Sequence, residues 1–126
     1  MKNTVCISFY LRHTTIRLHR STIRGLNNPP FIRFLISDDC KTMIVQSYEK
    51  KDFRSVRLCA NQKGKSDNSE IRSMGLCECV ARINGWDFIN SYRIYGKAIE
   101  HMGIAIFDFS SQEIIGERTS DDADCT

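Results

Sequence analysis

Arginine is the side chain best placed to do chemistry in the N-terminal part of the chain, because it recurs there with no acidic residue nearby. The positions are Arg12, Arg17, Arg20, Arg24 and Arg33. The planar guanidinium group matches phosphate oxygens and guanine edges alike. Ser21 and Thr22 stand at the start of a predicted helical turn, where hydroxyl and backbone N–H groups can contact phosphate. The pattern predicts a binding face for double-stranded DNA, with a solvated charged face as the alternative.

Charge forms a gradient along the 126 residues. The formal charge is +6 over residues 1–37, +3 over residues 38–97 and −6 over residues 98–126. A basic N-terminal part suits a polyanion, through charge steering and counterion release.

The acidic end suggests an alternative function. Its carboxylates are Glu100, Asp108, Glu113, Glu117, Asp121, Asp122 and Asp124. Such a surface can occupy a basic nucleic-acid channel by charge complementarity. The alternative is therefore a small inhibitor from a mobile element, anti-CRISPR-like, whose partner is a nucleic-acid-binding protein. The simpler interpretation is that these acids are solvated and only balance the basic face.

Cysteine and histidine are the candidate metal ligands. Of the six cysteines, Cys77 and Cys79 form a C-x-C pair. A structural zinc site needs a second pair or two nearby histidines, and His13, His19 and His101 are widely separated. We expect no metal and no cofactor. The scattered cysteines predict free thiols in a reducing cytoplasm.

Known catalytic patterns are absent from the sequence. It contains neither a Gly-rich phosphate loop nor a Gly-x-Ser-x-Gly elbow. His19 is expected to be an exposed neighbour of Arg17 and Arg20, and Cys59 a packed thiol. We therefore expect a protein that is not an enzyme.

Hydrophobic periodicity predicts the elements that position these residues. Strands are expected over 4–11, 15–20, 31–36, 41–47, 92–95, 104–109 and 114–115. A short helical turn is expected over 22–26, capped by Ser21, and a helix over 70–84 with Gly85 as its C-cap. The segment 61–69 has no apolar residue and is expected to be a mobile loop. The first apolar run, 5–11, is interpreted as a strand rather than a signal peptide, and no run reaches the about 20 apolar residues of a membrane span.

The two ends of the chain resemble each other weakly. At a constant offset Arg17 matches Arg93 and Leu18 matches Ile94, and each segment continues into an apolar run. We therefore predict one domain over 1–126, with pseudo-repeated halves at 15–47 and 92–115 and an acidic tail at 117–126. The expected fold class is α+β: a small antiparallel β-barrel or curled sheet from the two β units, with one inserted helix.

The segment from Thr15 to Ser47 resembles the AbrB/MazE/SpoVT swapped-hairpin family of DNA-binding proteins. The matching positions are Ile16, Leu18, Ile23, Leu26, Phe34-Leu35-Ile36 and Met43-Ile44-Val45. The family's Gly-Arg-(aliphatic)-x-(aliphatic)-Pro core is absent, and Arg20-Ser21 stands where proline is expected. The resemblance implies a transcriptional regulator, a homodimer or two halves paired within one chain as in MraZ-like members, and DNA contacts near Arg12, Arg17, Arg20 and Arg24.

Overall fold

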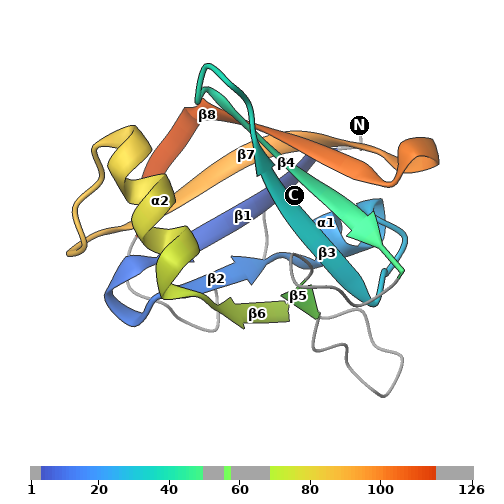
Figure 1. Ribbon diagram of the computed structural model, residues 1–126, viewed down its shortest axis with the longest axis horizontal. Helices are drawn as coiled ribbons and strands as arrows, with labels where there is room; N and C mark the ends of the chain where they lie inside the picture. The colour runs from blue at the N-terminus through green and yellow to red at the C-terminus, as the bar shows by residue number, and fades with distance from the viewer. Residues whose placement is uncertain (1–3, 50–55, 58–68, 116–126) are drawn as a thin grey trace.

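A computed structural model describes residues 4–49, 56–57 and 69–115 of the protein. It is an α+β fold built on one curled antiparallel sheet (Figure 1). The strands are β1 (Thr4–Tyr10), β2 (Thr15–Leu18), β3 (Phe31–Ile36), β4 (Thr42–Tyr48), β5 (Val56–Arg57), β6 (Ser69–Arg72), β7 (Ser91–Ile99) and β8 (Ile104–Ile115). The helices are α1 (Arg20–Gly25) and α2 (Met74–Asn84), with 3-10 turns η1 (Leu11–His13) and η2 (Glu100–Met102).

The sheet order is β5-β3-β4-β8-β7-β1-β2-β6. Both predicted halves therefore contribute strands to one sheet. Every ladder between described strands is antiparallel. The curled-sheet expectation and the α+β class are confirmed.

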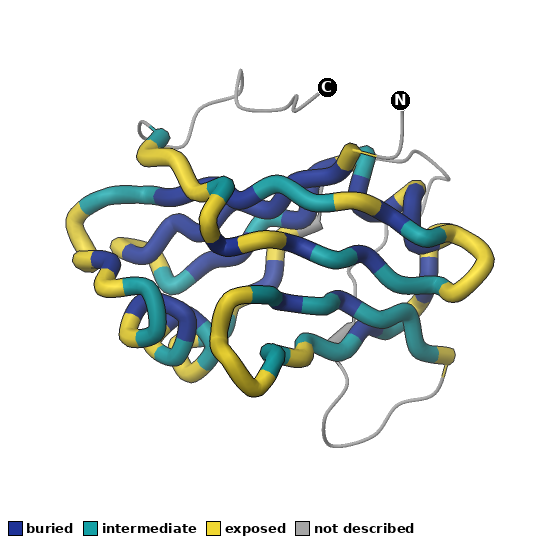
Figure 2. The backbone as a smooth tube through the Cα atoms, turned by 90° about the horizontal axis from the view of Figure 1, so that it is seen from above, coloured by how far each residue is buried: buried dark blue, intermediate teal, exposed yellow. Residues whose placement is uncertain are grey.

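The core fills the concave side of the sheet. Side chains alternate along each strand, so one set points inward. On β1 the inward set is Val5, Ile7 and Phe9, and all three belong to the hydrophobic core. Figure 2 shows this burial along the inner strands and the exposed connections at the ends.

Strand β1 is buried on both of its faces. Its outward residues Cys6, Ser8 and Tyr10 are at most 1% exposed. A strand buried on both faces reads as a nearly continuous apolar run, which is why its alternation in the sequence is loose.

The helix predicted over 70–84 begins later, at Met74. Residues Ser69–Arg72 form β6, which pairs with β2. Ser73 then caps the helix, because its hydroxyl oxygen accepts the backbone N–H of Leu76 at 3.2 Å. The predicted C-cap is confirmed, since Gly85 has a φ of 68°. The rest of the predicted loop over 61–69 lies outside the described residues, as does the tail over 117–126.

The second half does not reproduce the first element by element. Between β7 and β8 the chain forms only the 3-10 turn Glu100–Met102, whereas the first half has the helix α1. The strands expected over 104–109 and 114–115 are one strand, β8, and the polar residues Ser110–Gln112 between them form a bulge where the register with β7 shifts. The hydroxyl of Ser111 stabilises this bulge by accepting the backbone N–H of Tyr95 at 2.8 Å and donating to the carbonyl of Asp108 at 2.6 Å.

The bulge lies next to a very close approach of β7 and β8. A Cβ atom on Gly96 would lie 2.0 Å from the backbone oxygen of Ile106 and 2.8 Å from the Cα of Phe107. These atoms are backbone and have no rotamer to change. Only glycine fits at this position.

We therefore expect Gly96→Ala to lower the free energy of unfolding by about 1–3 kcal/mol through overpacking. Gly75→Ala is the matched control, because nothing lies within 4 Å of its added Cβ and alanine stabilises a helix by up to about 1 kcal/mol over glycine. Urea denaturation should give opposite signs for the two variants. A Gly96→Ala protein as stable as the wild type would contradict this packing.

Candidate nucleic-acid interface

Helix α1 is held against β1 by one threonine. The hydroxyl of Thr22 accepts the backbone N–H of Cys6 at 3.1 Å and donates to the Cys6 carbonyl at 2.7 Å. The threonine side chain thus continues the hydrogen bonding of β1 beyond the end of β2. It fixes the helix at the point where the β1–β2 ladder stops.

Helix α1 also packs closely on β7. A Cβ atom on Gly25 would lie 2.6 Å from the Cβ of Ala98. Two small residues therefore let the helix lie against the strand, while Ile23 enters the core. The predicted helical turn is confirmed, but its N-cap is His19 and not Ser21.

Two of the predicted DNA-binding residues lie together on this helix. Arg20 and Arg24 are four positions apart, so they occupy the same face of α1. Both are exposed, whereas Thr22, Ile23 and Gly25 of the same helix are buried. The fixed inner face of α1 thus directs this arginine pair (Arg20 and Arg24) toward solvent.

The other three predicted arginines lie on other elements. Arg12 is exposed on η1, at the opposite end of β2 from α1. Arg17 lies on the outer face of β2, with its Nε 3.8 Å from a carboxylate oxygen of Glu70. Arg33 lies on β3, with its guanidinium carbon 3.8 Å from the centre of the Tyr48 ring.

The outer face of β1 carries a buried polar cluster that was not predicted. Ser8 stands opposite Arg17 on one neighbouring strand and opposite Arg93 on the other. The Nε of Arg93 donates to the Ser8 hydroxyl at 3.0 Å, and that hydroxyl lies 2.8 Å from Nε2 of His19. The match of Arg17 with Arg93 at a constant offset is the sequence signal that could have indicated this cluster, because both residues lie opposite Ser8.

The expectation for His19 was wrong. It is 0% exposed, as is Ser8. Strand alternation placed it correctly on the outer face, but that face is itself covered at β1. Ser8 and His19 are both buried, and the contact between them joins β1 to the start of α1.

Replacing Ser8 with alanine should lower the free energy of unfolding by about 1–3 kcal/mol, because the buried Arg93 Nε–H loses its acceptor. Urea denaturation measures this change. Ser110→Ala removes a hydroxyl from an exposed position and should leave the midpoint almost unchanged. Equal midpoints for both variants would contradict a structural role for the cluster.

The described acidic residues are dispersed and partly used inside the fold. Two hydrogen bonds from Ser110, one from its hydroxyl and one from its backbone N–H, lower the pKa of Asp108. The carboxylate of Glu113 accepts the Tyr95 hydroxyl at 2.6 Å. Burial, and then this carboxylate, raise the pKa of Tyr95. The acids Glu117, Asp121, Asp122 and Asp124 lie outside the described residues.

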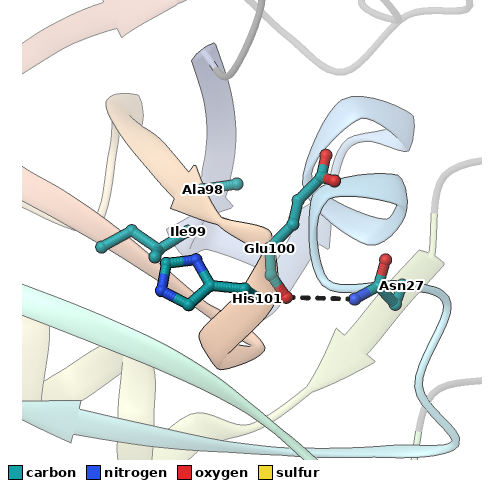
Figure 3. Close-up of a pocket in the computed structure, with 5 residues that line it drawn as sticks. All are labelled: Asn27, Ala98, Ile99, Glu100 and His101. Carbon is teal, nitrogen blue, oxygen red and sulfur yellow. Dashed lines mark hydrogen bonds between the residues drawn. The ribbon is translucent and has the colours of Figure 1, made fainter.

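An open groove of about 680 Å³ runs beside α1, lined by Asn27, Ala98, Ile99, Glu100 and His101 (Figure 3). The Nδ2 of Asn27 donates to the backbone oxygen of Glu100 at 3.2 Å. This bond joins the loop after α1 to η2. The side chains of Glu100 and His101 are exposed, and the Glu100 carboxylate extends from η2 toward α1 (Figure 3).

The cysteines do not form a common site. Cys77 is buried in the core, whereas Cys79 lies two positions on and is half-buried. Burial raises the pKa of the Cys77 thiol to about 11. Within the described ranges, no group of three His, Cys, Asp or Glu side chains could hold a metal ion. The expectation of free thiols fails at Cys6, which is disulfide-bonded. Cys59 lies outside the described residues.

Alkylation should therefore distinguish two thiols by their exposure. Iodoacetamide at pH 8 should modify Cys40, which is exposed and free, and leave Cys77 unmodified until the protein is unfolded in urea. A thiolate is the reactive form, and burial keeps Cys77 protonated. Peptide mass mapping measures the extent of alkylation at each cysteine. Alkylation of Cys77 in the folded protein as fast as that of Cys40 would contradict the burial of Cys77.

Comparison with known proteins gives no relative: no family model, curated protein or solved structure matches the chain. Neither helix in the described part of the chain has the length and apolar character needed to cross a membrane.

Proposed function

We propose that the protein binds DNA without catalysing a reaction and regulates transcription by occupying its site. The observation that supports this is the exposed arginine pair on a helix whose inner face is fixed to β1 and β7. Because the helix backbone is already fixed, little backbone freedom is lost when the two arginines bind.

The proposal assigns unequal weight to the five arginines. Arg20, Arg24 and Arg12 are exposed, and we assign them the phosphate contacts. The charge of Arg17 is partly offset by Glu70, and Arg33 is stacked on Tyr48. We assign these two a smaller share of the affinity.

The helix is short, and this limits the kind of contact. Six residues span about 9 Å at 1.5 Å per residue, and only two of them, Arg20 and Arg24, are exposed. Contacts from α1 should therefore go mainly to the phosphate backbone, and the affinity should depend strongly on salt.

Fluorescence titration of a labelled duplex over a range of salt concentrations tests the proposal. Each arginine that contacts a phosphate contributes about 0.9 to the slope of log affinity against log salt. The double variant Arg20→Ala/Arg24→Ala should therefore lose about 1.8 from that slope and bind at least tenfold more weakly at low salt.

Arg82→Ala is the matched control, because Arg82 is exposed on α2, away from α1. It removes one positive charge and should retain most of the wild-type slope. Absence of duplex binding by the wild type at low salt would refute the proposal. Equal losses per charge in the two variants would show that net charge, not the arginine pair, determines binding.

A further inference from the structure

The groove beside α1 has a carboxylate in its lining, and the helix next to it carries the arginine pair. Glu100 extends its carboxylate toward α1 (Figure 3), and Asn27 lies two residues after the end of the helix that carries Arg24. A carboxylate repels phosphate and accepts hydrogen bonds from N–H groups. The arginine pair attracts phosphate. A nucleic-acid strand bound along α1 would therefore meet cations at the arginine pair and a hydrogen-bond acceptor at the groove.

The walls of the groove also suit a base. Ala98 and Ile99 form apolar wall, and His101 offers an exposed ring. Unpaired bases stack on histidine as they do on other aromatic side chains. A carboxylate accepts hydrogen bonds from the N4 amino group of cytosine. Thymine has no amino group, and its one N–H donor on that edge, N3–H, lies between two carbonyl oxygens that repel a carboxylate.

We infer that this groove binds an unpaired, amino-bearing nucleobase, cytosine being the probe of choice, with the Glu100 carboxylate as acceptor and the His101 ring as stacking surface. The inference rests on the proposed function, which assigns phosphates of the same nucleic acid to Arg20 and Arg24. It extends that function from the duplex backbone to single-stranded segments, because a base inside a duplex is stacked on both faces and cannot stack on His101.

Single-stranded homopolymers test the inference. Fluorescein-labelled dC8 should bind the wild-type protein about tenfold more tightly than dT8, the discrimination expected of one good base contact. Glu100→Gln should reduce this preference to within about twofold, because an amide donates as readily as it accepts. His101→Ala should weaken both oligonucleotides, because stacking does not depend on the identity of the base.

Glu78→Gln is the matched control. It removes one negative charge from an exposed position on α2 and should leave the preference for dC8 at about tenfold. The same control separates a specific contact from a general gain in positive charge, which would tighten both oligonucleotides equally.

The outcomes separate this inference from the proposed function. Equal binding of dC8 and dT8 by the wild type, or a preference that survives in Glu100→Gln, would overturn the base site. If Arg20→Ala/Arg24→Ala still weakens duplex binding in that case, the proposed function stands. Failure of the wild type to bind duplex, dC8 and dT8 alike would overturn both.

Discussion

The burial of β1 on both of its faces is the constraint on which the rest of the structure depends. Its inner face carries Ile7 and Phe9 into the core, and its outer face encloses Ser8. The hydroxyl of Ser8 receives the Nε–H of Arg93 and meets His19. Side chains therefore join β1 to β7 and to the start of α1, in addition to the backbone ladders that β1 forms with β2 and β7.

The candidate interface follows from this constraint. The backbone of Cys6 on β1 binds Thr22, and the close contact of Gly25 with Ala98 sets the helix against β7. With its inner face occupied in this way, α1 can only direct Arg20 and Arg24 outward. The Asn27 bond to the Glu100 carbonyl then places the groove next to the same helix.

The sequence predicted local elements better than their relations. The strand over 31–36 and the Gly85 cap matched the structure because periodicity and a left-handed glycine are local signals. His19 was wrongly predicted to be exposed, because alternation shows which face a side chain lies on and not whether that face is covered. Residues 70–72 were assigned to the helix because Ile71 also fits a helical spacing. The dispersal of Arg12, Arg17 and Arg33 depends on strand order, which no local pattern encodes.

Chemical-shift mapping of the backbone amides during titration with a short duplex tests the central claim most directly. The claim is that α1, fixed to β1 and β7, carries the nucleic-acid surface. The account predicts that the largest shifts fall within residues 20–28 and that α2 changes little. Shifts concentrated instead on the exposed apolar residues Phe88, Ile89 and Ile114, with α1 unchanged, would contradict it.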